Sequence, residues 1–346
     1  MKVIKIISLN LFFFLILFLL IELIFGYWFD KDNLGPYMRE HRMKKNPISL
    51  KFENKNYDFI YKRNYHGFRG EEIAIENIKM VLIGGSTADE RYKPFELTIT
   101  GLVNKKLKEN KSKLRLVNAG IEGQSTKGHI FNFENWFPKL KKFNPEYFIF
   151  YIGINDHLAN PDKNQISDGH VANPSKIEFI KDNLKSRSLI YDLLRKVKHK
   201  YYINDEKKVS YDFDKSINDY TKGKFDFLAY DDAIKIHNLK NLKKKHKKLI
   251  KTYLNNVDKL VDYSKEYNAK PIFINQLTYE GSRPKKLFIL NYTLIEHCKK
   301  KKYFCIDLAK ELKGKKEFWW DGVHTTPAGS KQIVEIIYPK LINFLK

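Results

Sequence analysis

The sequence predicts an α/β fold in which helices cover both faces of a central, five-stranded parallel sheet. Five short and continuously apolar segments have the character of buried strands, amphipathic helical segments alternate with them, and one long apolar run stands apart at the N-terminus. With 346 residues, of which 43% are hydrophobic, the chain is long enough to bury a sizeable core.

The N-terminal run, residues 6–29, predicts a transmembrane helix. It holds 24 residues with one charge, Glu22, and about 20 apolar residues are enough to cross a bilayer. Tyr27 and Trp28 stand where interfacial aromatic residues are expected. No small-residue cleavage pattern follows, so we expect an uncleaved, single-pass anchor rather than a removed signal peptide. Basic residues flank the run on both sides, but long domains translocate largely regardless of charge, so we expect the main domain outside the cytoplasm.

Five strands and five helices are predicted in alternation after residue 78. The strands lie at 79–84, 114–120, 147–153, 270–276 and 304–307. Leucines and other apolar residues at helical spacing place the helices at 95–109, 127–142, 237–268, 285–300 and 327–345. The helix at 237–268 is long, with its lysines on the face opposite the apolar stripe, which is typical of a solvated face.

Two segments do not follow this alternation of strands and helices. Residues 31–78 between the anchor and the first strand are mixed in character, and residues 156–235 read as an insertion of irregular structure and short helices. The predicted organisation is therefore an anchor at 1–30, a membrane-proximal segment at 31–78 and a main domain at 79–346 that contains a variable insertion at 156–235.

The net charge of +24 arises from 64 Lys and Arg against 40 Asp and Glu. An anionic partner such as an acidic glycan or lipid headgroups would suit this excess, but a solvated lysine-rich surface explains it as well. No nucleic-acid-binding motif accompanies the charge, so we expect no nucleic-acid partner. The sequence does not specify an oligomeric state.

The two cysteines, Cys298 and Cys305, fall at the end of a predicted helix and in the next predicted strand. A disulfide between them is geometrically demanding, so free or buried thiols are the expectation. The cysteine and histidine spacing does not predict a metal site.

Polar residues gather where the predicted strands end. The first strand ends in Gly84-Gly85-Ser86-Thr87, the second in the segment 118–126 (NAGIEGQST), and the third in 153–156 (GIND), while 319–329 (WWDGVHTTPAG) follows the last. Parallel strands bring their carboxyl ends to one edge of the sheet, where sites of such folds lie. The sequence therefore predicts a site at this edge.

Three interpretations of the first loop compete. It lacks both the P-loop pattern and the Rossmann glycine pattern, although a generic anion site at a helix N-terminus stays open. Ser86 could simply cap a helix. The third interpretation makes Ser86 a nucleophile, which requires a neighbouring base.

The other loops supply what a serine nucleophile needs. His324 can act as the base, and Asp321, three residues earlier in one tight loop, can orient its imidazole. Attack on an ester carbonyl also needs donors for the developing oxyanion, and the candidates are the N–H groups of Ser86 and Gly123 and the side-chain amide of Asn155. Each residue alone has a plainer explanation as a turn or cap, but their order at successive strand ends favours catalysis.

These loops resemble the four conserved blocks of the SGNH (GDSL-like) hydrolases, over about residues 79–346. The resemblance implies a flavodoxin-like three-layer sandwich, with Ser86 as nucleophile, Gly123 and Asn155 as oxyanion donors, and Asp321 and His324 completing the triad. One departure is that the first block usually reads Gly-Asp-Ser, whereas Gly85 stands in the place of the aspartate. The resemblance implies neither a metal nor another cofactor.

The expected function is that of a membrane-anchored serine esterase acting on acyl esters, O-acetyl esters above all, of a cell-envelope glycan or lipid. Alternatives are an O-acyltransferase that passes the acyl group to a sugar, a lysophospholipase or thioesterase, and an inactive polysaccharide-binding module. The fold class itself cannot choose among substrates.

Arg69, in the segment 64–70 (NYHGFRG), has two interpretations. It could bind an anionic group of the substrate, or it could be a structural ion pair or backbone clamp, which is the commoner role of such an arginine.

Overall fold

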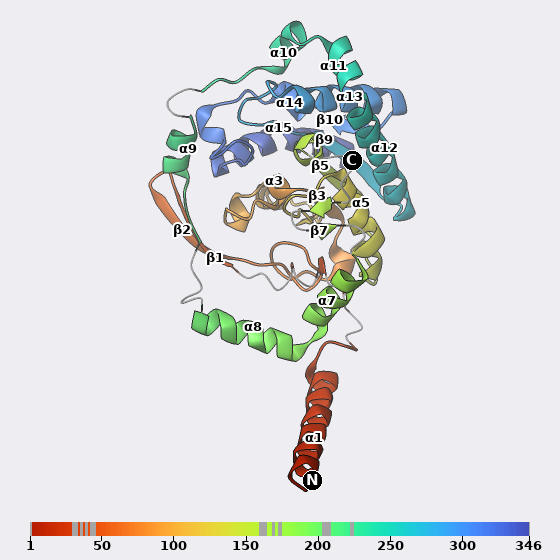
Figure 1. The fold of residues 1–346 in the computed structure, drawn as a ribbon. Helices are drawn as coiled ribbons and strands as arrows, with labels where there is room; N and C mark the ends of the chain where they lie inside the picture. Colours follow the sequence, from red (N-terminus) through yellow and green to blue (C-terminus); the bar gives the residue numbers. More distant parts are fainter. Residues whose placement is uncertain are drawn as a thin grey trace.

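The computed structural model describes residues 2–29, 34, 37–38, 41, 46–158, 165–167, 170–171, 175–202, 209–221 and 225–345. A body built around a five-stranded sheet carries one helix, α1 (Lys2–Phe25), that projects from it as a separate rod (Figure 1). Among the described residues, α1 holds the one stretch, Val3–Phe25, long and apolar enough to cross a membrane, and this stretch is not buried.

The central sheet has the strand order and direction of a flavodoxin-like fold. Its strands are β3 (Met80–Gly84), β4 (Leu116–Asn118), β5 (Tyr147–Ile152), β9 (Lys270–Asn275) and β10 (Phe304–Ile306). They lie in the order β10-β9-β5-β3-β4, and every neighbouring pair is parallel. Numbered along the chain this is the order 2-1-3-4-5, which is the flavodoxin-like doubly wound topology. The predicted fold class is therefore confirmed.

Side chains alternate between two cores, one on each face of the sheet. Met80 and Leu82 of β3 belong to one core, together with helices α4 (Ile99–Glu109) and α15 (Pro327–Leu345). Val81 and Ile83 belong to the other core, together with α5 (Thr126–Asn135) and α12 (Lys247–Glu266). Since successive side chains of a strand point to opposite faces, apolar residues at every strand position mean that both faces are covered.

The predicted helix at 237–268 is not continuous, and this prediction is wrong in part. It is divided at His246 into α11 (Leu239–Lys245) and α12, and His246 caps both pieces. Leu242 of α11 packs in one core, whereas Tyr253 and Val257 of α12 pack in the other. One straight helix cannot reach both faces of the sheet, so the chain turns between them.

A second, three-stranded sheet joins the membrane-proximal segment to the insertion. It consists of β1 (Asn46–Phe52), β2 (Lys55–Tyr61) and β8 (Val209–Asp212), in the order β2-β1-β8. β1 and β2 form an antiparallel hairpin whose two turn residues, Glu53 and Asn54, both have positive φ, as the favoured two-residue turn requires. The insertion therefore contributes a strand that its irregular sequence did not predict, while the domain boundaries stay a prediction.

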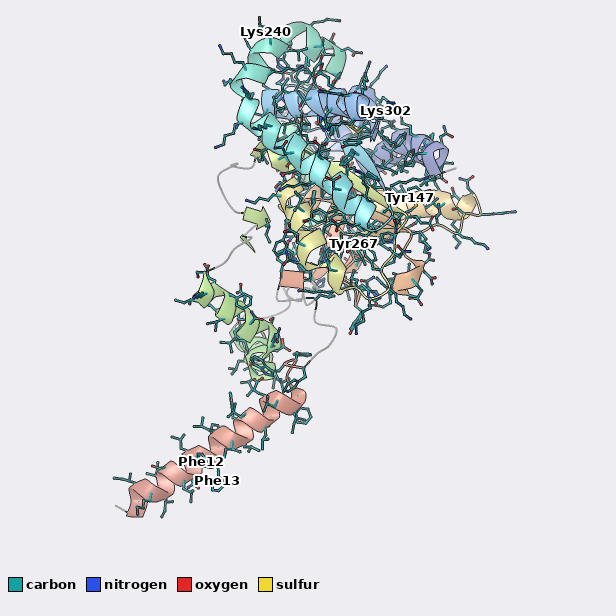
Figure 2. The ribbon with its side chains drawn as sticks, turned by 90° about the vertical axis from the view of Figure 1, so that its right-hand side faces the viewer. Phe12, Phe13, Tyr147, Lys240, Tyr267 and Lys302 are labelled. Atoms are coloured by element: carbon teal, nitrogen blue, oxygen red, sulfur yellow. A yellow bond between two sulfur atoms is a disulfide. The ribbon has the colours of Figure 1, made fainter. Side chains whose placement is uncertain are left out.

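The remaining elements are one long helix of the main domain, several short elements, and the elements of the predicted insertion. The helices are α3 (Ser86–Asp89), α6 (Ile154–Leu158), α7 (Lys176–Arg187), α8 (Leu189–Tyr202), α9 (Phe213–Thr221), α10 (Tyr230–Ile236), α13 (Lys285–Lys301) and α14 (Leu308–Glu311); β6 (Gln165–Ser167) and β7 (His170–Val171) form a small hairpin. Figures 1 and 2 both show α7 and α8 between α1 and the rest of the body.

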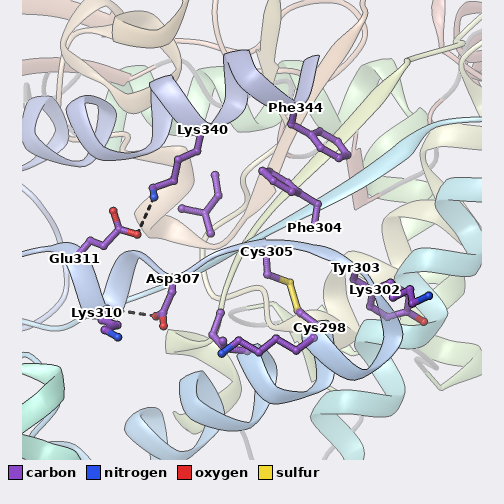
Figure 3. A pocket seen from close by; sticks show the side chains of 13 residues that line it. Cys298, Lys302, Tyr303, Phe304, Cys305, Asp307, Lys310, Glu311, Lys340 and Phe344 are labelled. Carbon is purple, nitrogen blue, oxygen red and sulfur yellow. Dashed lines mark hydrogen bonds and ion pairs between the residues drawn. A yellow bond between two sulfur atoms is a disulfide. The ribbon is translucent and has the colours of Figure 1, made fainter. Parts of the chain in front are cut away.

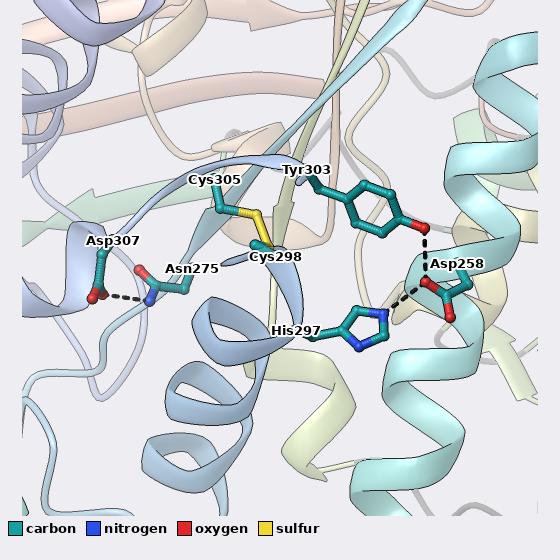
Figure 4. Close-up of a disulfide and its surroundings, with 7 residues drawn as sticks. All are labelled: Asp258, Asn275, His297, Cys298, Tyr303, Cys305 and Asp307. Atoms are coloured by element: carbon teal, nitrogen blue, oxygen red, sulfur yellow. Dashed lines mark hydrogen bonds and ion pairs between the residues drawn. A yellow bond between two sulfur atoms is a disulfide. The ribbon is translucent and has the colours of Figure 1, made fainter. Parts of the chain in front are cut away.

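Cys298 and Cys305 form a disulfide, so the expectation of free thiols is wrong (Figure 4). α13 ends and β10 begins within a few residues, and this tight connection brings the two Cα atoms to 6.2 Å. The bond lies at the edge of the central sheet. Beside it, the Tyr303 hydroxyl and the ring of His297 hydrogen-bond to Asp258.

Candidate active site

Three side chains from two distant loops meet at the carboxyl end of β3. His324 Nε2 lies 2.8 Å from Ser86 Oγ, and His324 Nδ1 lies 2.7 Å from Asp321 Oδ2. Ser86 is the first residue of α3, directly after the strand, and 238 positions of chain separate it from His324. The structure thus brings together the three residues that the sequence predicted as a triad, in the connectivity of a nucleophile, a base and an orienting carboxylate.

The loop 319–326 is folded so that Asp321 holds His324. Asp321 Oδ1 accepts the backbone N–H groups of Val323 and His324, which leaves Oδ2 for the imidazole. Burial raises the pKa of Asp321, but the hydrogen bonds and the charge of His324 outweigh burial and bring that pKa below its ordinary value. When the imidazole is neutral, the carboxylate at Nδ1 keeps the ring proton on that nitrogen, and the Nε2 lone pair then faces the Ser86 hydroxyl.

Aromatic rings surround His324. The Trp320 ring is stacked on the imidazole at a centroid distance of 5.7 Å, and the Tyr92 ring meets it edge-on at 5.1 Å. Tyr211 of β8 contacts both Trp320 and Tyr92. The insertion therefore forms part of the wall of this site, through the small sheet.

The predicted oxyanion donors lie in the loops that meet beside Ser86 at the carboxyl end of β3. Ser86 occupies the first turn of α3, where backbone N–H groups have no partner within the helix. Asn155 Nδ2 donates to the carbonyl of Gln124, the residue after Gly123, at 2.8 Å. Gly123 has φ +73° in a turn closed by the N–H of Gln124 on Ile121, a position that favours glycine. Like Ser86 and His324, Gly123 and Asn155 are half-buried, whereas most of their chain neighbours are buried.

Asp156, next to Asn155, holds two of these loops together. Its Oδ1 accepts both the backbone N–H and the hydroxyl of Thr126, at 3.0 and 2.6 Å. Burial raises the pKa of Asp156 to about 6, although the hydrogen bonds oppose this. The carboxylate therefore ties the loop after β4 to the loop after β5, which positions Gly123 beside Asn155.

The structure leaves no room for a side chain at position 85. A Cβ at Gly85 would lie 2.1 Å from Asn155 Nδ2 and 3.0 Å from the Gln124 carbonyl oxygen. Its backbone has φ −88°, which any residue can adopt, so the constraint is the close approach of Asn155 rather than the turn itself.

If Asn155 is the oxyanion donor that the sequence predicts, we expect Gly85→Ala to reduce kcat for ester hydrolysis by up to about 100- to 1,000-fold, which is the cost of losing one such donor. The new methyl group would push the Asn155 amide away, and the backbone carbonyl of Gln124 would have to shift by only a few tenths of an ångström, so we expect the fold to be kept. Asn155→Ala and the double variant should lose about as much as Gly85→Ala, since all three remove the same donor. Additive losses in a kinetic comparison of the three would contradict this explanation.

A buried network of charges beneath the site was not predicted. Lys93 and Glu90 form an ion pair whose side chains are each 1% exposed, and Lys93 Nζ also donates to the carbonyl of Thr325, the residue after His324, at 2.8 Å. Glu90 is the C-cap of α3 and accepts the N–H of Ile99 at the start of α4. This pair therefore connects the segment that carries Ser86 to the loop that carries His324.

Arg69 belongs to the same network. Its guanidinium is buried and donates to the backbone carbonyls of Asp89 and Lys93. Arg63, also buried, pairs with the Asp89 carboxylate at 2.9 Å. Of the two interpretations of Arg69, the structure favours the backbone clamp and not the substrate ligand. The signal in the sequence is four charged residues at 89–91 and 93, shortly after Ser86, where a wholly solvated segment is not expected.

The described residues hold no group of three or more His, Cys, Asp or Glu side chains suited to a metal ion. A pocket of about 540 Å³ lies beside β10, lined by the disulfide and by side chains that include Lys340 and Phe344 (Figure 3). None of the predicted site residues lines it. The candidate active site is therefore the half-open region around Ser86 and His324, and not this pocket.

Neither a family model nor a curated protein matches the chain. Solved structures match it at low identity. The psychrotrophic esterase EstA from Pseudoalteromonas sp. is 14% identical over 77% of this chain and 98% of the esterase, with a TM-score of 0.43. An acetylxylan esterase from Geobacillus stearothermophilus, solved as a catalytic mutant, is 15% identical over 76% of this chain and 94% of that esterase, with a TM-score of 0.42. A GDSL-like lipase from Bacteroides thetaiotaomicron is 12% identical over 79% of this chain and 92% of that lipase, with a TM-score of 0.39. The activity of this chain therefore has to be argued from its own residues.

Proposed function

We propose that the protein is a membrane-anchored serine ester hydrolase of the SGNH type. The observation that carries this proposal is the chain of contacts from Ser86 Oγ through His324 to the Asp321 carboxylate, at 2.8 and 2.7 Å. The order of the motifs along the chain supports the same class. A binding module would have no need for a base held in one tautomer against a serine hydroxyl.

In the proposed reaction Ser86 Oγ attacks the acyl carbonyl carbon while His324 Nε2 takes the hydroxyl proton. The carbonyl oxygen becomes an oxyanion, which the N–H groups of Ser86 and Gly123 and the Asn155 amide stabilise. The C–O bond to the leaving alcohol then breaks, and His324 returns the proton to that alcohol. A water, deprotonated by His324, attacks the acyl-enzyme, and the acid leaves as Ser86 recovers its proton.

The proposed substrate is an acyl ester, in particular an O-acetyl ester, on a glycan or lipid of the cell envelope. The apolar helix α1 suits a membrane anchor. The Cys298–Cys305 disulfide supports a domain outside the cytoplasm, because disulfides persist in oxidising compartments.

The test is covalent labelling of the full chain in detergent with a fluorophosphonate probe, followed by peptide mapping. We expect the label on Ser86, and hydrolysis of p-nitrophenyl acetate to exceed that of long-chain p-nitrophenyl esters. Labelling at another serine, or no labelling of folded protein, would contradict the assigned nucleophile. Faster hydrolysis of the long-chain esters would favour the lysophospholipase or thioesterase alternative.

A further inference from the structure

Helices α7 and α8 of the insertion carry an exposed apolar surface. Eight large apolar side chains on these two helices are exposed: Ile177, Phe179, Ile180, Leu184, Tyr191, Leu193, Leu194 and Val197. Elsewhere in the described body such residues are scattered, apart from those of α1. A contiguous exposed apolar surface on a folded protein marks an interaction site.

Most of the exposed apolar residues fall on one side of their helix, although Phe179 of α7 lies on the opposite side from Ile177 and Ile180. Ile177, Ile180 and Leu184 of α7 follow the spacing i, i+3, i+7, and Leu194 and Val197 of α8 follow i, i+3. The two helices together contain eight Lys and Arg against three acidic residues. A basic helix with an apolar stripe is the pattern of helices that lie in the interface of a membrane with anionic lipids.

The contacts of α1 place these helices at the end of the predicted membrane span. Glu22, the single acidic residue of α1, lies one turn before the helix ends at Phe25. Its carboxylate accepts the N–H groups of Leu189 and Ile190 in the first turn of α8, at 3.1 and 2.9 Å, and the hydroxyl of Ser188 at 2.6 Å. A carboxylate at a helix N-terminus satisfies free N–H groups and is stabilised by the helix dipole.

The predicted interfacial aromatic residues make the same connection. Trp28 Nε1 donates to Glu22, and the N–H of Tyr27 donates to the carbonyl of Arg187, the last residue of α7. The junction of α7 and α8 is therefore bound to the segment where a transmembrane helix emerges from the bilayer. In Figure 1, α8 runs crosswise to α1 at this level, and in Figure 2 both helices separate α1 from the body.

We propose that α7 and α8 lie on the surface of the bilayer that α1 crosses, with their apolar stripes inserted below the lipid headgroups. The proposal rests on α1 being the membrane anchor proposed above. It gives the single acidic residue of α1 a role, because Glu22 holds α8 in the plane of the interface. A single span alone would let the body move freely above the membrane; this second contact fixes the height and tilt of the active site relative to the lipid surface.

The test uses the full chain in nanodiscs of phosphatidylcholine and phosphatidylglycerol, with single cysteines labelled by the fluorophore NBD. The two native cysteines are joined in a disulfide and do not compete for the label. Ile180→Cys and Leu194→Cys report on the proposed surface, and Leu15→Cys reports on the anchor. Ile236→Cys in α10 is the matched control, because Ile236 and Leu194 are both 63% exposed, and α10 lies at the far end of the body in Figure 1.

We expect lipids with a shallow doxyl group to quench the labels at 180 and 194 by about twofold or more, and iodide in solution to quench them several-fold less than the label at 236. Labels at 180 and 194 that respond like the label at 236 would overturn the proposal. Protection from both quenchers would also overturn it, since it would show that protein, such as a second copy of the chain, covers these helices. The label at 15 is tested with lipids that carry the doxyl group deep in the acyl chains, because residue 15 lies near the middle of the span. If that label escapes the deep quencher, the anchor itself is wrong, and the two failures are thereby distinguished.

Discussion

Ser86→Ala is expected to lower kcat for p-nitrophenyl acetate on the order of 10⁴-fold or more, which is the scale of removing a triad nucleophile. In the proposed reaction the Ser86 hydroxyl oxygen forms the acyl-enzyme, and an alanine has no group that can take its place. KM should change little, because the N–H of residue 86, Gly123 and Asn155 keep their positions. The measurement is steady-state hydrolysis by the full chain in detergent, with wild type and variant prepared together.

The control for this variant is another serine whose hydroxyl is hydrogen-bonded but remote from the chemistry. Ser49 in β1 donates to Asp58 at 2.8 Å and is expected to tolerate Ser49→Ala with full activity. Equal unfolding temperatures of wild type, Ser86→Ala and Ser49→Ala would show that the loss of activity in Ser86→Ala comes from the missing hydroxyl and not from unfolding. If Ser86→Ala hydrolyses the ester as fast as wild type, the esterase proposal based on this triad fails.

The central fold was predictable because its signal is local. The strands of the main sheet are continuous apolar segments, and a segment such as residues 147–152 can be buried only between two layers of helices. The candidate site was predictable for a related reason: parallel strands bring their carboxyl ends to one edge, so residues 86, 123 and 155 had to approach each other.

Features that depend on tertiary structure were less predictable. The apolar spacing of residues 237–268 continues through His246, and nothing in it shows that Leu242 and Tyr253 face different cores. The pairing of β1 with β8 joins segments some 160 residues apart, and neither strand is strongly apolar. Similarly, the proximity of Cys298 and Cys305 depends on how tightly α13 turns into β10.

The buried charges were missed because charged side chains are usually exposed. Arg63, Arg69 and Lys93 look like surface residues in a chain with a charge of +24. Each is buried, and each makes a contact within or to the segment 89–93 at the end of α3. The site is therefore positioned by a polar support that apolar periodicity cannot reveal.

Lys93→Met tests how much the site depends on this support. Burial lowers the pKa of Lys93 below its ordinary value. The charge of Glu90 and its hydrogen bond raise this pKa, but by less than burial lowers it. Removing the ammonium leaves the Glu90 carboxylate buried without its partner, and we expect the free energy of unfolding to fall by about 3–5 kcal/mol. Because Lys93 also holds the Thr325 carbonyl, His324 should lose its alignment with Ser86, and kcat should fall even where the protein stays folded.

The chain offers a close control for this variant. Lys265 and Asp262 form an ion pair with the same i, i+3 spacing, at 3.0 Å, but their side chains are 67% and 72% exposed. Lys265→Met should change unfolding little, because solvent screens an exposed pair. Urea unfolding in detergent and ester hydrolysis, measured for both variants, separate burial from the mere loss of a lysine.

A second substitution distinguishes an unpaired charge from a lost contact. If the cost of Lys93→Met comes from leaving Glu90 charged and unpaired, then Glu90→Gln in the same chain should recover part of the free energy of unfolding. Activity should recover less, because the glutamine cannot replace the lysine bond to the Thr325 carbonyl that positions His324. If the free energy of unfolding and the activity recover together, the ion pair of Lys93 and Glu90 serves only the fold. If Lys93→Met lowers the free energy of unfolding no more than Lys265→Met does, the buried pair does not support the site.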